Sequence, residues 1–585
     1  MISVNESVMK RNMKPSSGKI KQFMYEKRWF LLMLAFVVVF AIIPLLTMNI
    51  FVGHDTQFHI NRIEALAQEM QMGNFFPRMY STAISGNGYA TPLFYGDLFL
   101  LIPAFLYGFC GVSIYASLTI FMIMLFLAVS VSMYCCVYNI TQNKASSCCA
   151  AVLFALSSYF CTDMFARGAI GEAQAFVFLP ITFLGFYNIL YRNMEKWYLL
   201  PIGLALMIHV HLLSSVMTVF VFVLLMLFSF DKVIKEPKKI LYLAISALVF
   251  LVLSVDFILP MLEQLISTTL MSSAEYPLAV LGPLAYTAMP SWAVFCDFTI
   301  FTTYYKTINY FPNGISIAII LLIGYLLFYK RTKNRLIWHS LIISGLFIVM
   351  ATKLFPWSIF LDVFGIMQFP WRLLIYPTFF VALAAGVYFG SIDLNKKTFI
   401  LMGAMIAVSL FSYCVNLTPY FMQYNKFTNG GQQEVEYIEA FGLNDYLPIM
   451  EEYGESTEPY MDELRELSDT IVCSSDDIVA DFVRKDGKLI VNFKNNTAND
   501  ATIEVPILMY KGYTATLDDG TNLECDYGQY NRIKVSINDI NEGTFVVEYT
   551  GTVIQHVSRV ISIVAVLGLA AYLVIDKIKF QKSKI

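Results

Sequence analysis

The sequence predicts an α-helical protein that crosses a membrane many times and carries a smaller extracytoplasmic domain, an α/β-sandwich-like unit, before its last span. Hydrophobic residues make up 57% of the 585 residues, charged residues only 14%, and the mean hydropathy is +0.61. A soluble chain of this size needs more charge to cover its surface, so the composition indicates a polytopic membrane protein. The net charge of −3 gives no basic surface for nucleic acid.

The first hydrophobic stretch is expected to stay in the mature chain as a membrane anchor. Trp29–Phe51 is long enough to cross a bilayer. The basic leader before it runs to Arg28, the apolar stretch is longer than the core of a signal peptide, and no A-x-A-like cleavage site follows.

The positions of Lys and Arg orient the remaining spans. Basic clusters recur along the chain and should all lie in the cytoplasm, so each consecutive pair needs two crossings between its members. Three apolar stretches lie between Arg28 and Lys144, and the shortest, Leu93–Phe109, is therefore expected to be re-entrant or interfacial. This reasoning predicts about twelve spans with both termini cytoplasmic, in the cell membrane.

The chain is expected to divide into four parts. They are a cytoplasmic basic N-terminus (1–28), a transmembrane domain (29–417), an extracytoplasmic domain (418–555), and a last transmembrane helix with a basic cytoplasmic tail (556–585). Polar and apolar residues alternate with period two between Gly-bearing turns of the third part, which predicts a small antiparallel β-sandwich there. The expected strands are Lys488–Phe493, Thr502–Val505, Arg532–Ile537 and Thr544–Tyr549.

Two cysteines, Cys473 and Cys525, lie in this extracytoplasmic segment. Their spacing alone does not decide whether they form a disulfide.

A cluster of ionisable residues directly follows the first span, at the start of a long external loop that the topology predicts over Val52–Pro92. The ten residues Gly53–Arg62 contain Asp55, two histidines and an arginine. Charge at the membrane surface costs free energy and often marks a functional site. Further polar residues fall at helix ends that the topology places on the same outer side: Asp163, Arg167, Glu172, His209, His211, Asp256 and Arg372.

Each of these residues also has a purely structural interpretation. Asp55 is suited to cap the following helix, because Asp is a favoured N-cap residue. Arg167 and Glu172 are close enough in sequence to form an ion pair within their loop. His211 is accounted for as an ordinary interfacial polar residue, and Arg372 as an arginine that reaches toward lipid phosphates.

Several motifs resemble those of bacterial YfhO-like membrane proteins and of a relative labelled "6-pyruvoyl-tetrahydropterin synthase-related". The motifs are Gly53-x-Asp55-x-x-x-His59-x-x-Arg62, Gly88-Tyr89-x-x-Pro92-x-Phe94-Tyr95, Arg167-Gly168-Ala-x-Gly171-Glu172, Gln368-Phe-Pro-Trp-Arg372 and Asp445-Tyr-Leu-Pro448. Tyr513 stands where the YfhO pattern is expected to have Trp. No residue pattern supports pterin chemistry. The overall layout is similar to the GT-C superfamily of glycosyltransferases, which use polyprenyl-linked sugars.

The resemblance implies sugar transfer from a polyprenyl-phosphate carrier to an envelope glycan or glycolipid outside the cytoplasm. Inverting transfer needs a carboxylate that accepts the acceptor's proton and cations that stabilise the departing phosphate. By the resemblance, Asp55 and Glu172 are the catalytic candidates. The substrate-binding candidates are His59, Arg62, Arg167, His211 and Arg372, and the other candidates for the second acid are Asp163 and Asp256. No metal site is assigned, since no dense ligand cluster is present, although a divalent metal stays an alternative.

Two other classes of function remain open. A transporter of lipid-linked saccharide should have ionisable residues in mid-membrane and a repeat that relates its halves, and neither is visible in the sequence. A non-catalytic scaffold of envelope assembly would keep the fold without the chemistry. Convergence of Asp55, Arg167, Glu172 and Arg372 on one cavity that opens to the lipid would favour an enzyme, and their dispersal would favour the scaffold.

Overall fold

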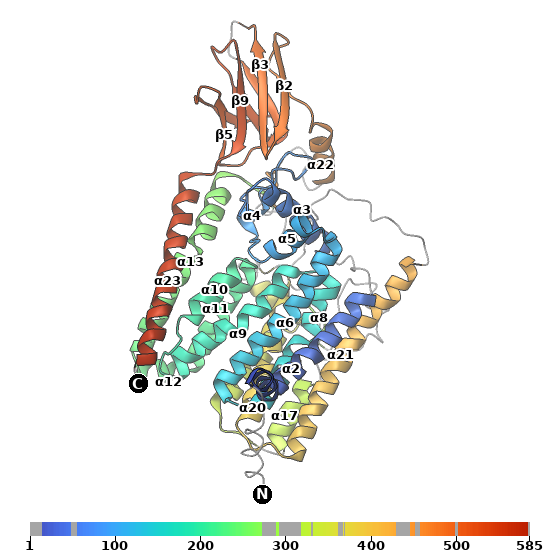
Figure 1. Cartoon of the computed structure of the whole chain (residues 1–585), viewed down its shortest axis with the longest axis vertical. Coiled ribbons are helices and arrows are strands. Elements are labelled where there is room, and N and C mark those ends of the chain that lie inside the picture. Colours follow the sequence, from blue (N-terminus) through green and yellow to red (C-terminus); the bar gives the residue numbers. More distant parts are fainter. Residues whose placement is uncertain are drawn as a thin grey trace.

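The structure places a β domain at one end of a helical body (Figure 1). It is a computed structural model that describes residues 15–47, 55–271, 288–291, 318–328, 331–360, 367, 369–428, 445–450, 457–497 and 501–582.

Seven described helices are long and apolar enough to cross a membrane. They are α2 (Pro15–Thr47), α6 (Ile114–Thr141), α9 (Ile170–Tyr191), α13 (Lys238–Ser267), α20 (Ile375–Gly390, extended by the 3-10 turn η6, Pro370–Leu374), α21 (Lys396–Thr428) and α23 (Val553–Lys582). An eighth candidate is a bent pair, because α7 (Lys144–Ala155) and the segment from α8 (Ser158–Cys161) to Phe165 pass the same test together across a bend of 43°. Apolar helices of this length account for the membrane character of the composition.

The predicted number of about twelve spans is not confirmed. The other four expected spans coincide with shorter helices: α10 (Leu199–Ile208), α11 (Leu212–Phe228), α17 (Ala318–Phe328) and α18 (Arg335–Met350). At a rise of about 1.5 Å per residue, helices of 10 to 17 residues are shorter than a hydrocarbon core of about 30 Å. Hydropathy identified their apolar character, but α10, α11 and α18 end before they reach spanning length, and the residues on both sides of α17 lie outside the described part of the chain.

The segment after the first span, expected to be an external loop, is largely helical. It contains α3 (Thr56–Gln71), whose side chains are mostly buried although many are polar. The apolar stretch expected to be re-entrant forms two short helices, α4 (Thr91–Phe94) and α5 (Leu101–Cys110), and α5 packs against α3 and α6. A ten-residue α5 is too short to span.

The C-terminal domain consists of two antiparallel sheets, so the β character predicted for it is confirmed. The sheet orders are β1-β4-β8-β7 and β2-β3-β9-β5-β6. The strands are β1 (Val472–Cys473), β2 (Ile478–Lys485), β3 (Lys488–Asn495), β4 (Thr502–Leu508), β5 (Tyr513–Leu517), β6 (Asn522–Leu523), β7 (Cys525–Tyr527), β8 (Arg532–Ser536) and β9 (Glu542–Tyr549). Remaining short elements are α12 (Phe230–Lys235), η4 (Trp357–Ile359), α22 (Thr457–Glu466) and η8 (Gln529–Asn531).

The two cysteines of this domain are free thiols on opposite edges of one sheet. Cys473 pairs with Ile503, Ile503 with Val535, and Val535 with Cys525. Three strand spacings of about 4.8 Å separate the cysteines, which is too far for a disulfide. The Cys473–Cys525 disulfide, which the sequence left undecided, is therefore not formed in this fold.

The β domain contacts the helical body through the loop after α3. Arg484 on β2 donates to the carbonyl of Gly86 at 2.7 Å, and Asn87 donates to the carbonyl of Leu464 at 2.9 Å. Helices α13 and α23 run side by side toward this domain (Figure 1). The site described next therefore lies close to the junction of the two parts.

Candidate functional site

An irregular turn in the chain positions the first site residues. After α8 the backbone continues as a π-helix, η1 (Thr162–Arg167), which ends at Gly168 with a φ of +64°. A Cβ at Gly168 would lie 2.0 Å from the hydroxyl of Thr56, so only glycine allows α3 to begin so close to this turn. Short π-helical segments occur frequently at functional sites. This one brings the start of α3 next to Arg167.

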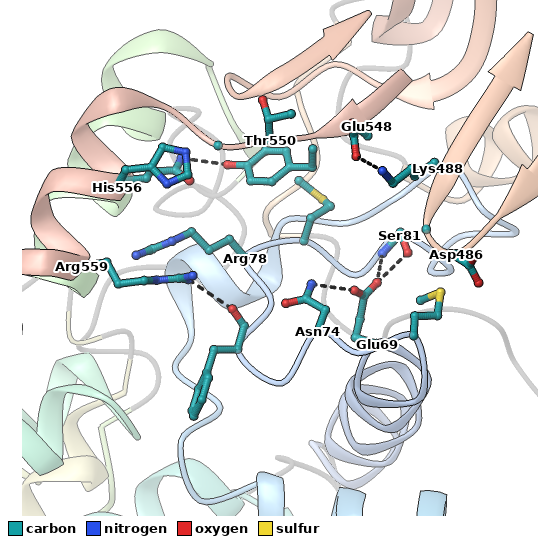
Figure 2. Close-up of a pocket in the computed structure, with 17 residues that line it drawn as sticks. Glu69, Asn74, Arg78, Ser81, Asp486, Lys488, Glu548, Thr550, His556 and Arg559 are labelled. Carbon is teal, nitrogen blue, oxygen red and sulfur yellow. Dashed lines mark hydrogen bonds and ion pairs between the residues drawn. The ribbon is translucent and has the colours of Figure 1, made fainter. Parts of the chain in front are cut away.

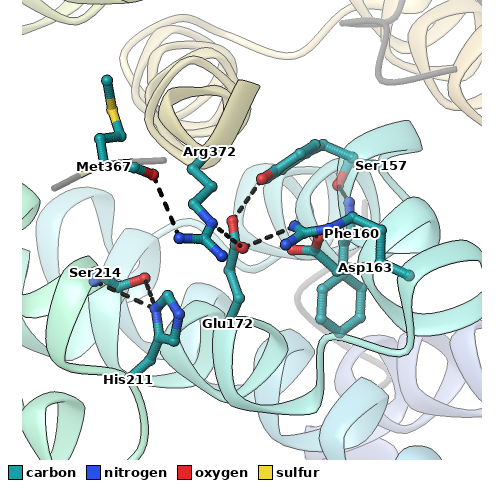
Figure 3. Close-up of polar contacts among 10 residues, drawn as sticks. Ser157, Phe160, Asp163, Glu172, His211, Ser214, Met367 and Arg372 are labelled. Carbon is teal, nitrogen blue, oxygen red and sulfur yellow. Dashed lines mark hydrogen bonds and ion pairs between the residues drawn. The ribbon is translucent and has the colours of Figure 1, made fainter. Parts of the chain in front are cut away.

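Four charged residues form a buried cluster at this turn (Figure 3). Arg167 donates to Asp163 at 2.7 Å and to Glu172 at 2.8 Å. The Nε atom of Arg372 lies 3.7 Å from the same Glu172 carboxylate. The ion pair that the sequence offered for Arg167 and Glu172 is thus present, and Arg372 joins it from a position 200 residues further along the chain. Two carboxylates and two guanidiniums compensate one another, as buried charges require.

Neighbouring groups hold this cluster in place. The hydroxyl of Tyr159 donates to Glu172 at 2.5 Å. Arg372 also donates to the carbonyl of Met367 at 3.3 Å. Glu172 is 1% exposed and is held by Tyr159 and both guanidiniums. These contacts engage both oxygens of the Glu172 carboxylate within the protein, and its predicted catalytic role stays a prediction.

Asp55 lies beside the cluster in the position that a helix cap would occupy. Its N–H donates to the carbonyl of Arg167 at 2.7 Å, and its own carbonyl accepts from the N–H of His59 at 3.1 Å. The carboxylate, however, makes no capping hydrogen bond to α3. A capping role therefore accounts for where the Asp55 backbone lies, but the Asp55 carboxylate itself does not cap the helix.

Arg62 has a different environment from the one that the sequence predicted. It is 1% exposed and forms an ion pair with Asp97, which also accepts from the hydroxyl of Tyr80 at 2.6 Å. Arg62 also donates to the carbonyls of Tyr95 and Gly96, at 3.2 and 2.9 Å. These contacts bury Arg62 within the protein, so as a phosphate-binding residue it needs correction: its donors are already engaged.

Tyr95 connects the two charged groups. Its ring lies 4.3 Å from the guanidinium of Arg62 and 5.9 Å from the rings of both His59 and His211. Gly171, one residue before Glu172, leaves the space that Tyr95 needs, because a Cβ there would lie 2.0 Å from the tyrosine oxygen. The candidate residues of α3, α9 and the α10–α11 junction thus form one continuous site.

Both histidines of the site are buried and neutral. Burial, followed by the charge of Arg62, lowers the pKa of His59 well below its usual value. Burial lowers the pKa of His211 to about 3. The Nδ1 atom of His211 accepts from the N–H of Ser214 at 3.3 Å and so caps α11. Neither imidazole carries positive charge near neutral pH.

Asp256 belongs to a separate group. It lies 3.3 Å from His209 and accepts from the hydroxyl of Ser562 at 3.0 Å, on helix α23. Among the described residues, Asp256 forms no hydrogen bond or ion pair with Glu172. Its contacts instead join the end of α10 and helix α13 to α23.

Two further acids belong to the site and had no role in the sequence-based assignment. Asp97 is the one carboxylate inside the apolar stretch Leu93–Phe109. A charge in such a stretch costs free energy, and this could have marked Asp97 as a functional or paired residue. Asp445 precedes Tyr446, which stacks on Phe94 at 4.8 Å. Burial, followed by the nearby charge of Asp55, raises the pKa of the Asp445 carboxyl. Its motif had been noticed, but only contacts across the fold connect it to Asp55.

Among the residues that the structure describes, no group of three or more His, Cys, Asp or Glu side chains is arranged to hold a metal ion.

Comparison with known proteins places the chain next to proteins without an assigned activity. Residues 5–386 match a family described as "Family of unknown function (DUF6541)". An uncharacterized protein of Lactococcus lactis subsp. cremoris (strain MG1363) is 25% identical over 345 residues, which cover 56% of this chain and 54% of that protein. The chain therefore matches about half the length of that curated relative. The resemblance to YfhO-like proteins stays a prediction.

One solved structure is similar in part. It is described as the cryo-EM structure of the arabinofuranosyltransferase AftD from Mycobacteria. The match covers 67% of this chain and 27% of AftD, with 14% sequence identity and a TM-score of 0.38.

Proposed function

We propose that this chain, which belongs to the DUF6541 family of unknown function, is a membrane glycosyltransferase. It moves a sugar from a polyprenyl-phosphate carrier to an envelope acceptor outside the cytoplasm. The observation that carries the proposal is Asp55, whose carboxylate does not cap the helix that begins there and whose backbone N–H donates to the carbonyl of Arg167 in the Arg167–Glu172–Arg372 cluster.

Asp55 is the proposed base. A carboxylate that makes no bond to its own helix is available to accept the proton of an acceptor hydroxyl. As the acceptor oxygen bonds to the anomeric carbon of the sugar, the bond from that carbon to the phosphate oxygen breaks. The bonding electrons leave with the phosphate, and the acceptor proton passes to Asp55.

Arg372 is the proposed group for the departing phosphate. A guanidinium stabilises negative charge that develops on phosphate oxygens. Of the three arginines in the site, Arg62 is buried against Asp97, and Arg167 is bound by two carboxylates. Arg372 has the longest of the carboxylate contacts, 3.7 Å from its Nε to Glu172, so its ion pair with a carboxylate is the weakest of the three.

Glu172 and Asp163 act in this proposal as positioning residues. They hold Arg167 between them, and Glu172 also orients Arg372. The expected four-part division of the chain fits the same scheme, with both termini in the cytoplasm. The β domain then lies on the acceptor side, where it contacts the loop between α3 and α4.

The test replaces Asp55 by Asn and measures transfer of radiolabelled sugar from polyprenyl phosphate in membranes. A matched control is Glu64→Gln, because Glu64 lies on the same helix, more than two turns further along. We expect turnover to fall at least 100-fold in Asp55→Asn and to stay near wild type in Glu64→Gln. Unchanged turnover in a folded Asp55→Asn protein contradicts the proposed base, and no transfer by wild type from any tested carrier favours the non-catalytic scaffold. Envelope glycans and polyprenyl-phosphate sugars from a deletion strain, compared with its parent by mass spectrometry, would identify the sugar.

A further inference from the structure

A polar cavity lies away from this site, where the β domain meets the helical body (Figure 2). It has a volume of about 220 Å³, several times the ~30 Å³ that one water occupies in the liquid. Its walls come from the end of α3 and the loop after it, the β2–β3 hairpin, the end of β9 and the first turns of α23 (Figure 2). None of the residues proposed above for sugar transfer lines it.

Two acidic residues, Glu69 and Glu548, lie at one end of the cavity (Figure 2) and already have partners. Glu69 accepts from Asn74 at 2.9 Å and from the N–H and hydroxyl of Ser81 at 2.7 and 2.6 Å. Glu548 pairs with Lys488 at 2.7 Å. Figure 2 shows both groups, together with Asp486, on the side of the β2–β3 hairpin.

Two arginines occupy the other end. The side chains of Arg78 and Arg559 lie next to each other below His556 (Figure 2). Arg78 donates to the backbone carbonyl of Asp256 at 2.8 Å, and Arg559 donates to the backbone carbonyl of Phe76 at 3.2 Å. Within the described part of the chain, neither guanidinium forms an ion pair with a carboxylate.

Two neighbouring guanidinium groups repel each other. Burial, followed by the charge of Arg559, lowers the pKa of Arg78 to about 10. The carboxylate of Asp256, whose backbone carbonyl accepts from Arg78, is already engaged with His209 and Ser562. Such a pair is stable when a bound anion lies between its members, because each guanidinium has five N–H donors in a fork that matches phosphate oxygens.

The surroundings of the cavity are suited to a ligand that also has an apolar part. Phe76, which lines the cavity, is 63% exposed, and Phe75 beside it is 46% exposed. Phe75 stacks on Phe109 of α5 at 6.4 Å, and Phe109 stacks on Phe105 at 5.2 Å. Exposed aromatic rings in contact with one another are typical of a membrane interface.

We propose that Arg78 and Arg559 form an anion site that binds a phosphate group, carried either by a membrane lipid or by a soluble phosphate compound. The site is separate from the proposed sugar-transfer site, so its test does not depend on that activity. His556 adds a further nitrogen at the same end of the cavity.

The experiment titrates the purified full-length protein in a non-ionic detergent and follows binding by calorimetry. The probes are dihexanoyl phosphatidic acid, inorganic phosphate, and dihexanoylglycerol, which has the same acyl chains without phosphate. Variants are Arg559→Gln and Arg559→Lys, with Arg192→Gln as the matched control. Arg192 is exposed and also donates to two backbone carbonyls, but it lies outside the cavity.

We expect saturable binding that weakens at least tenfold in Arg559→Gln, weakens less in Arg559→Lys, and is unchanged in Arg192→Gln. Binding should also weaken as salt concentration rises. Binding of phosphatidic acid without binding of inorganic phosphate identifies a lipid as the source, and equal binding of both identifies the phosphate group alone. The proposal is overturned if neither phosphate probe binds saturably, if dihexanoylglycerol binds as tightly as phosphatidic acid, or if Arg559→Gln keeps wild-type affinity. Arg559 is half-buried on the outer turn of α23, so its replacement should leave the fold intact, and thermal unfolding checks this.

Discussion

Replacement of Asp97 by Asn tests whether Arg62 stabilises the fold or is available to a substrate. Asp97 accepts from Arg62 Nε at 3.1 Å and from the hydroxyl of Tyr80 at 2.6 Å, and its side chain is 10% exposed. Asn keeps the shape of the side chain and one acceptor oxygen but removes the negative charge. The variant therefore leaves the Arg62 guanidinium buried without a counter-charge.

The expected loss can be worked from the geometry. Two unit charges 3.1 Å apart attract by about 5 kcal/mol at an effective dielectric constant of about 20. Removal of one partner of a buried ion pair costs about 3–5 kcal/mol by comparison with other proteins. Because Asn keeps an acceptor, we expect about 3 kcal/mol, at the lower end of that range. The assay is a denaturant titration in detergent, followed by the fluorescence of the six tryptophans.

Two controls make this result interpretable. Asp231→Asn removes the acid of an exposed pair with Arg335, which has a similar contact distance of 2.8 Å, and should change the stability very little. The double variant Arg62→Met with Asp97→Leu removes both charges and should recover most of the lost stability. If Asp97→Asn is as stable as wild type, Arg62 is solvated, and the argument that removed it from the phosphate candidates is refuted.

Three further predictions follow from the same structure. The folded pKa of His211, about 3, lies below its ordinary value of about 6.5. Its contribution to stability is therefore complete above pH 6.5 and is lost as the pH falls toward 3, by at most about 1.4 kcal/mol per pH unit. Unfolding titrations of wild type and His211→Asn should diverge across this range, and parallel curves would contradict the burial of His211. Gly171→Ala, whose new Cβ would lie 2.0 Å from a tyrosine oxygen, should destabilise the protein by about 1–3 kcal/mol in the same assay, whereas Gly345→Ala has open space and should be neutral or stabilising. Cys473 and Cys525 should both react with a maleimide after unfolding without reductant, and protection of the two thiols would show that they are bridged.

Much of the architecture was predictable because it depends on local periodicity. Apolar stretches of spanning length and the period-two strands of the C-terminal domain each leave a signal within one window of sequence. Helix α3 shows the limit of this approach. Its buried polar residues, among them Arg62 and Glu69, depend on partners at Asp97 and Ser81. Hydropathy shows that these residues are polar, but it does not show which residues elsewhere in the chain they pair with. The sequence therefore predicted an external loop where α3 lies.

The candidate site divides in the same way. Arg167 and Glu172 are five residues apart, and their pairing was one of the interpretations that spacing alone offered. The contact of Arg372 with Glu172 joins two distant parts of the chain. The sequence indicated it only through the predicted topology, which placed both residues on the same outer side of the membrane. The pairing of Arg62 with Asp97 was missed, because Asp97 had been counted with an apolar stretch.

The contacts of the three arginines in the site indicate which of them could bind a phosphate group. A phosphate-binding arginine must exchange a protein contact for a substrate contact, and the exchange is least costly where the existing contact is weakest. Arg62 has an ion pair and two backbone carbonyls, and Arg167 has two carboxylates within 2.8 Å. Arg372 lies 3.7 Å from a carboxylate that it shares with Arg167, the longest carboxylate contact of the three. In the proposed mechanism, Arg62 and Arg167 therefore hold the surrounding structure in place, while Arg372 binds the phosphate and Asp55 accepts the proton.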